Sequence, residues 1–296
     1  MVNIPKRKSI FYYILISLRP SQWTKNLFVI APLIFAGEFT LDRILRSLFA
    51  FFVFSLLSGG LYIFNDLIDR ERDRNHPKKR MRPIASGALS PAVARLACIF
   101  FVLFSLALSL FLGPFFAIVS FSFTCLMIAY TLYLKEIPIL DILTVAFSFV
   151  LRVEAGASAI DVSASTWIIL CTFLLAILLS TGKRRGEILS LKVSASSHRE
   201  VLRDYTIPFL EQLMSVSASA CIISYALYTF FSPTSASHPL LVWTIPFVIY
   251  GITRYLYLSH KTELAEFPDQ VVVKDLPLLL CIFLWALLCI SIILLL

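Results

Sequence analysis

Three aspartates at the end of a long apolar run are the first residues whose spacing suggests chemistry. Asp66, Asp69 and Asp73 are separated by three and then four residues, and Asn65 directly precedes the first. If the apolar run is a helix that continues through this point, one face carries all three carboxylates, with Asn65 on the adjacent row. Such carboxylates repel one another, and a divalent cation removes that cost. Oxygen ligands of this kind favour Mg²⁺, which commonly also binds substrate phosphates.

A plainer interpretation of the same stretch is a charged loop. Arg70, Arg72 and Arg74 alternate with the acids and can neutralise them as solvated ion pairs, which is the usual role of a mixed charge run. Spacing alone does not decide between a magnesium site and such a loop.

A basic run follows the aspartates and matches the chemistry of phosphate binding. Lys78, Lys79, Arg80 and Arg82 lie within five residues of one another, and arginine forks and lysine ammonium groups are natural partners of phosphate oxygens. The alternative is attraction to anionic lipid, which requires no substrate. We favour that alternative for Lys78 and Lys79. Arg80 and Arg82 precede a Pro/Gly turn, "RPIASG", and are the better candidates for specific contacts.

A second polar cluster lies between two later apolar runs. The segment "YTLYLKEIPILD" contains Tyr130, Lys135 and Asp141, and we expect Lys135 and Asp141 to face the first cluster across a helix bundle. Arg152 lies inside the next apolar run, on the same helix face as Asp141 because eleven residues are about three turns. An arginine at membrane depth is a candidate for function. An ordinary polar turn, and a structural pairing of Arg152, remain alternatives.

Two more basic segments lie at the ends of apolar runs. Their polar and aromatic residues are those of an interfacial anchor or of a phosphate site. The candidates are Arg19, Trp23, Lys25 and Asn26 in "LRPSQWTKN", and Lys183, Arg184 and Arg185 in "STGKRRGE".

The composition indicates the class of protein in which these clusters lie. Of the 296 residues, 59% are hydrophobic and only 15% are charged, so the chain is a polytopic, all-α membrane protein. No polar segment is long enough for a soluble domain, which predicts a single domain over residues 1–296. We predict nine transmembrane helices near residues 22–38, 44–64, 91–112, 114–134, 139–159, 164–182, 208–231, 240–258 and 276–296.

The basic residues are distributed very unevenly between the two sides of this arrangement. With a cytoplasmic N-terminus, 22 of the 26 Lys and Arg residues lie on inner segments and two on outer segments. The positive-inside rule therefore predicts a cell (inner or plasma) membrane protein whose C-terminus is outside and whose site faces the cytoplasm. The net charge of +8 reflects this topology and does not indicate a nucleic-acid partner. The six cysteines form no CxxC, and with four scattered histidines they support neither disulfides nor zinc.

The motifs together carry a family resemblance. "NDLIDRERD" resembles the NDxxDxxxD motif of the UbiA superfamily of membrane prenyltransferases, which are nine-helix intramembrane enzymes. Four strings resemble its decaprenyl-phosphate phosphoribosyltransferase branch over about residues 15–275. They are "LRPSQWTKNLFVIAPLIFAG", "NDLIDRERDRNHPKKRMRPIASG", "YTLYLKEIPILD" with "FVLRVEAG", and "STGKRRGE".

This resemblance implies a reaction. Members of the branch transfer 5-phosphoribose from phosphoribosyl diphosphate to a polyprenyl phosphate, with release of diphosphate. It further implies a Mg²⁺ cofactor on Asn65, Asp66, Asp69 and Asp73, and adds Lys135 and Asp141 to the catalytic aspartates. The implied substrate-binding residues are Lys25, Asn26, Arg80, Arg82, Tyr130, Arg152, Lys183 and Arg184.

Two local features bear on the branch. Lys135 and Asp141 stand where most of the superfamily has a second, paired-carboxylate motif, which favours the phosphoribosyl branch. The segment "FPDQVVVKD", with Asp269, Lys274 and Asp275, also resembles that branch. The alternatives are a UbiA-type prenyltransferase that joins a prenyl diphosphate to an aromatic or other small acceptor, and a transporter. Against a transporter, the polar residues lie on one side only, with no midplane site repeated in two halves. The oligomeric state is left open.

Overall fold

The computed structural model describes residues 9–37, 39–191, 200–261, 271 and 274–295, and every regular element among them is a helix. Among these described residues, eight helices are long and apolar enough to cross a membrane. They are α3 (Leu41–Ile68), α5 (Pro91–Ser109) extended by η3 (Leu110–Leu112), α6 (Pro114–Leu132), α7 (Leu140–Ala159), α8 (Thr166–Leu191), α10 (Ile207–Phe231), η7 (Pro239–Thr244) continued by α12 (Ile245–Lys261), and α14 (Leu276–Leu295). The predicted all-α, multi-pass class is confirmed.

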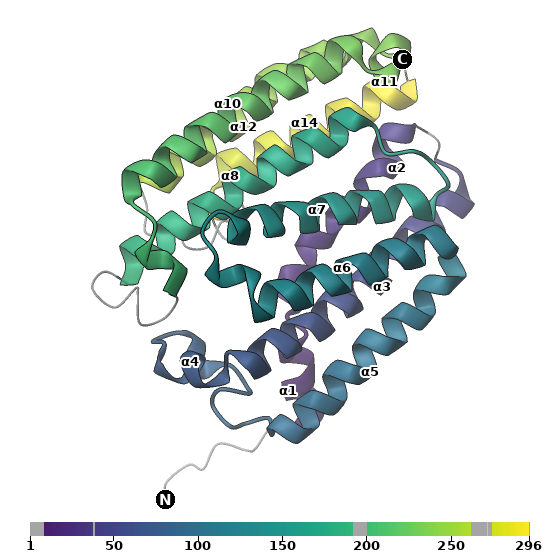
Figure 1. Ribbon diagram of the computed structural model, residues 1–296. Coiled ribbons are helices and arrows are strands. Elements are labelled where there is room, and N and C mark those ends of the chain that lie inside the picture. The colour runs from purple at the N-terminus through teal and green to yellow at the C-terminus, as the bar shows by residue number, and fades with distance from the viewer. Residues whose placement is uncertain (1–8, 38, 192–199, 262–270, 272–273, 296) are drawn as a thin grey trace, which may run out of the picture.

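The first predicted span is built differently. The prediction of one continuous helix over residues 22–38 is wrong, because the chain here passes from η1 (Pro20–Val29) to α2 (Ala31–Ala36), and α1 (Ile10–Ser17) precedes both. Arg19 adopts a left-handed conformation with φ 51° just before Pro20, and this ends α1. Figure 1 places α1 and α2 toward opposite ends of the bundle. The described residues do not confirm nine transmembrane helices, and that count stays a prediction.

The long helices are arranged as two groups that meet at α7 and α8. Figure 1 shows α10, α12 and α14 on one side of α8, with α7, α6, α3 and α5 following on the other. The first group packs around Leu178, Met214 and Ile252, and the second packs around Phe54 and Phe123.

Short helices gather at one end of the bundle. They are α4 (Arg70–Asn75), η2 (Lys79–Met81), η4 (Leu134–Glu136) and η6 (Glu200–Arg203). Figure 1 shows α4 at the end opposite to α11 (Pro233–Ser237) and to the end of α14. The predicted polar motifs therefore share one end of the molecule, and the helix that ends the chain finishes at the other.

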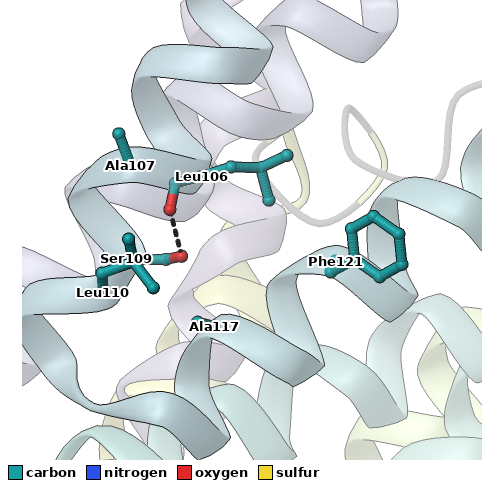
Figure 2. A pocket seen from close by; sticks show the side chains of 6 residues that line it. All are labelled: Leu106, Ala107, Ser109, Leu110, Ala117 and Phe121. Atoms are coloured by element: carbon teal, nitrogen blue, oxygen red, sulfur yellow. Dashed lines mark hydrogen bonds between the residues drawn. The ribbon is translucent and has the colours of Figure 1, made fainter.

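The outer face of α5 and α6 is apolar, as expected of a surface that contacts lipid. Between these helices lies a hollow of about 320 Å³. Figure 2 shows its lining residues, which are Leu106, Ala107, Ser109, Leu110, Ala117 and Phe121. The Ser109 hydroxyl donates to the Leu106 carbonyl at 2.6 Å, so its one polar side chain is already satisfied. The hollow contains no titratable group and is not a candidate for catalysis.

The broken first segment packs very closely against α7 at Gly156. A Cβ atom on Gly156 would lie 1.9 Å from the Val29 carbonyl oxygen, which belongs to the backbone and cannot move aside as a side chain can. Small residues permit such approach between membrane helices. Gly156 therefore fixes how near η1, which carries Lys25 and Asn26, lies to α7, which carries Asp141 and Arg152.

We predict that Gly156→Ala lowers the free energy of unfolding by about 1–3 kcal/mol, because overpacking forces η1 away from α7. Gly251→Ala is the matched control, since a Cβ there would meet its nearest atoms at 3.9 Å, an ordinary contact. Thermal unfolding of both variants in the same detergent measures the difference. Equal stability of the two variants would show that η1 is not held by this contact.

Candidate active site

Two buried carboxylates converge on one arginine at the polar end of the bundle. Helix α3 ends at Ile68, Asp69 occupies its cap, and α4 then begins a new helix, so the three aspartates do not share one continuous helix face. Asp66 and Asp73 are both buried. Nη1 of Arg82 donates to Oδ1 of Asp66 at 3.0 Å and to Oδ2 of Asp73 at 2.6 Å. Arg19 also pairs with Asp66.

Asp69 points to a different cation. Its Oδ1 accepts from Nζ of Lys135 at 2.5 Å, and the Lys135 side chain is buried. Next to this pair, Arg72 and Glu136 form a more exposed bridge of 2.5 Å. These two pairs tie the η4 turn to the junction of α3 and α4. Lys135 therefore faces the first cluster, as the sequence predicts.

Asp141 belongs instead to a second, buried network. Nε of Arg184 donates to Oδ2 of Asp141 at 2.6 Å, and the Tyr205 hydroxyl donates to its other oxygen at 2.6 Å. Arg184 also donates to Glu187 at 2.7 Å and to the Tyr130 hydroxyl at 3.2 Å. Tyr130, Asp141 and Arg184 thus form one network that joins α6, α7 and α8, and Asp141 does not face the first cluster as predicted, because its carboxylate is held by Arg184 and Tyr205.

The same network supports a strained turn before α7. Ile139 has φ 69°, which is costly for a β-branched residue. Its main-chain N–H donates to the Tyr205 hydroxyl at 2.6 Å. Burial and the hydrogen bond to Asp141 raise the pKa of Tyr205, so this hydroxyl keeps its proton. Tyr205 thereby fixes the turn that follows Lys135.

Asn26 and Arg152 lie deeper and are satisfied by other side chains. Nε of Arg152 donates to Oδ1 of Asn26 at 2.9 Å, and the Asn26 amide donates to the hydroxyls of Ser55 and Ser58 at 3.1 Å each. Arg152 also lies 4.8 Å from the centre of the Phe123 ring. Both were predicted to bind substrate. Their observed contacts hold η1, α3 and α7 together.

Lysines from three elements gather beside these networks. Lys25 of η1 and Lys79 of η2 each lie within electrostatic range of Lys183 on α8. Lys25 donates to the Gln22 side chain at 2.6 Å. Lys183 is half-buried and forms no hydrogen bond or ion pair with the part of the chain that the structure describes. Glu187 lies within the same range and offsets part of this charge. A cluster in which basic groups outnumber acids attracts anions such as phosphates.

The remaining predicted residues take no part in these networks. Arg80 is exposed, and the Asn65 side chain makes no hydrogen bond to a described residue. Asp275 receives two hydrogen bonds from Arg254, at 3.2 and 2.8 Å, which lower the pKa of this carboxyl and tie α12 to α14. Asp269 lies outside the described residues.

The carboxylates at Arg82 suit a divalent cation. Two acids from different helices reach one point with oxygen donors only, and burial raises the pKa of Asp73 even though Arg82 opposes this. Among the described residues no group of three acids, histidines or cysteines is close enough to hold a metal. Asp66 and Asp73 therefore form the part of the predicted metal set that the structure brings together, and Asp69 is drawn to Lys135.

Three residues at this end were not selected from the sequence as site residues. Tyr205 gave no signal, because it lies outside every motif. His76 is buried and accepts two main-chain hydrogen bonds; only its place in the run "NHPKK" marks it. Glu211 of α10 accepts from Nε of Arg185 at 2.9 Å, while Arg185 also donates to the Ser259 carbonyl of α12 at 2.8 Å.

Comparison with known proteins agrees with this geometry. A family model described as "UbiA prenyltransferase family" matches residues 26–266. A Corynebacterium glutamicum protein named decaprenyl-phosphate phosphoribosyltransferase is 33% identical over 267 residues, which cover 88% of this chain and 80% of that protein. A Mycobacterium tuberculosis protein of the same name is 31% identical over 274 residues, which cover 91% and 90%.

A solved structure shares the fold. It is a UbiA homolog from Archaeoglobus fulgidus bound to GPP and Mg²⁺, which aligns with a TM-score of 0.72 at 19% identity and covers 95% of this chain and 99% of its own.

We predict that Asp141→Asn lowers the free energy of unfolding by about 3 kcal/mol, because removal of one charge from a buried pair leaves Arg184 poorly compensated. Asp42→Asn is the control, since this carboxylate pairs with Arg46 at the surface and is 76% exposed. Unfolding in mixed detergent micelles measures both variants. A loss as small for Asp141→Asn as for Asp42→Asn would contradict the structural role of the buried network.

Proposed function

This chain belongs to the UbiA prenyltransferase family, and from that membership we propose that it transfers 5-phosphoribose from phosphoribosyl diphosphate to a polyprenyl phosphate. The relatives from Corynebacterium and Mycobacterium that share about a third of its residues are named for this activity. The observation that carries the proposal is the division of charge at the bundle end. Acids there are gathered on Arg82, Lys135 and Arg184, while Lys183, with Glu187 in electrostatic range, forms no ion pair with a described residue and can bind an anion.

The arrangement suits a reaction between phosphorylated partners. An oxygen of the acceptor phosphate attacks the anomeric carbon of the donor, and the bond from that carbon to the diphosphate breaks. The departing diphosphate takes the electron pair. Lys183 and Lys25 bind phosphate oxygens and stabilise the negative charge that grows on the leaving group. The nucleophile is already an anion, so the site requires no strong general base.

Asp66 and Asp73 would hold Mg²⁺ in this proposal, with Asp69 and Asn65 close to them along the chain. When bound, Mg²⁺ supplies positive charge for the diphosphate oxygens. Arg82 shares the same carboxylates and its side chain is 25% exposed, so with Mg²⁺ held by Asp66 and Asp73 its guanidinium would be available to a phosphate. Tyr130 and Arg184 do not bind the ligand in this proposal; their hydrogen bond fixes the end of α8 from which Lys183 extends.

The location follows from the topology. The charged end of the bundle carries the inner segments of the positive-inside prediction, so we place the site at the cytoplasmic face of the cell membrane. A water-soluble donor can reach it from the cytoplasm, and the acceptor lipid can reach it from the bilayer between helices.

A prenyl transfer to an aromatic or other small acceptor is the second candidate. The solved homolog with GPP and Mg²⁺ shows that this fold accommodates a prenyl diphosphate in that protein. Lys135 argues for the phosphoribosyl reaction, because its ammonium group neutralises Asp69 and thereby adds positive charge where the alternative would have a second acidic cluster.

The decisive measurement uses purified protein, Mg²⁺, polyprenyl phosphate and radiolabelled phosphoribosyl diphosphate. We expect the label to appear in the lipid fraction and inorganic diphosphate to be released in equal amount. Turnover in detergent, where there is no sealed compartment, excludes transport as the source of the signal. Consumption of a prenyl diphosphate with an aromatic acceptor, without labelled lipid, would support the second candidate instead.

We predict that Asp66→Asn and Asp73→Asn each lower kcat at least about a hundredfold, because each removes a charge from the point where the diphosphate must be neutralised. Both should also weaken the response of the rate to Mg²⁺. Glu71→Gln is the matched control: it makes the same acid-to-amide change in the same segment, at a side chain that is 72% exposed. If the three variants behave alike, the aspartates belong to an ordinary charged loop.

A further inference from the structure

The turn after α4 is stabilised by hydrogen bonds to a histidine side chain. His76 ends α4 with an extended main chain (φ −87°, ψ 132°), the conformation that the following Pro77 requires. Its side chain is buried. Nδ1 accepts the main-chain N–H groups of Lys78 and Lys79 at 3.1 and 3.3 Å. Acceptance by Nδ1 places the ring proton on Nε2.

This imidazole decides where Lys79 lies. Two donors that Pro77 and the end of α4 would otherwise leave without a helical partner are satisfied by one side chain. The Arg82 main chain in turn donates to the Lys79 carbonyl at 2.9 Å. His76, Lys79 and Arg82 therefore belong to a single tight turn, in which the His76 imidazole accepts from the Lys79 main chain and the Lys79 carbonyl accepts from Arg82.

The two lysines that His76 holds differ in surroundings. Lys78 is exposed, whereas Lys79 is half-buried. Lys79 lies within electrostatic range of both Asp73 and Lys183. It is thus near both the acids that gather on Arg82 and the lysines proposed to bind phosphate.

We infer that Lys79 is a phosphate-binding residue of this site and that His76 is the positioning residue that holds it there through its main chain. The inference rests on the proposed function only in the identity of the ligand. The chemistry it requires is a diphosphate group between Lys79 and Lys183. It also reverses the sequence-based preference for Lys79 as a lipid anchor.

The test is a double-mutant cycle with a conservative rescue. His76→Leu removes the acceptor, Lys79→Met removes the charge, and each is expected to raise KM for phosphoribosyl diphosphate about tenfold, the cost of one hydrogen bond to a charged group. Because His76 acts through Lys79, the double variant should be no worse than the single ones. His76→Asn should stay within about twofold of the wild type, since Asn accepts from the main chain two residues on as Nδ1 does.

The control is Lys78→Met, which changes the neighbouring lysine on the same imidazole and should leave KM unchanged. The positioning role would be overturned if the rise in KM of the double variant were the product of the two single rises, or if His76→Asn failed to keep KM near the wild-type value. An unchanged KM in Lys79→Met would overturn the binding role. If His76→Leu does not fold, His76→Gln takes its place, because its amide oxygen lies one methylene further from the main chain.

A second readout separates this inference from the proposed function. Magnesium diphosphate should raise the unfolding temperature of the wild type and of His76→Asn, and should raise it less in His76→Leu and Lys79→Met. This shift is measured without any particular donor. If no labelled lipid forms but the shift keeps this pattern, the proposed function fails and the inference stands. If labelled lipid forms but the four proteins shift equally, the reverse holds.

Discussion

Arg82 lies between two buried carboxylates, and the polar end of the molecule is arranged around that contact. Asp66 belongs to a membrane-spanning helix and Asp73 to the short helix that follows it. In surroundings of low dielectric constant, neither acid is tolerable as an isolated charge. The guanidinium comes from the turn beyond both, so that turn must fold back over α4. Once it has done so, Asp69 is directed away toward Lys135, and η4 is drawn in with it.

The second network serves a different purpose because it excludes water more completely. The Arg184 side chain is only 2% exposed and Asp141 is fully buried, whereas the side chain of Arg82 is 25% exposed. The fully buried Arg184–Asp141 pair is costly to open and therefore fixes the relative positions of α6, α7 and α8. The Arg82 pair is more accessible, and in the proposed function it exchanges a partner for a metal or a phosphate. The less exposed ion pair then lies behind the proposed site, and the more exposed one lies within it.

The sequence predicts the parts of this picture that depend on local pattern. Apolar runs predict the eight long helices to within a few residues for most boundaries, and the distribution of basic residues predicts that the motifs share one end. The broken passage from α1 to α2 was not predicted, although η1 carries polar residues such as Gln22 and Asn26, and Pro20 and Pro32 lie at the starts of η1 and α2. At the candidate site, the roles of the chosen residues stay a prediction, and their partners within the protein were not predicted. Whether Asp141 meets a substrate or Arg184 depends on a tertiary contact across 43 positions of sequence, which spacing cannot reveal. Tyr205 was invisible for the same reason.

The division of labour between arginine and lysine follows from their chemistry. Arg19, Arg184 and Arg185 each bind an acid of the protein itself, and Arg152 binds Asn26. A planar, weakly hydrated guanidinium can hold several acceptors at once, which suits fixed contacts between helices. Lys25, Lys79 and Lys183 carry compact charges on flexible stems, and they surround the place where no helix needs to be joined. In the proposed reaction a ligand must bind and leave in every cycle, and such groups suit that task, while the arginine contacts join the helices.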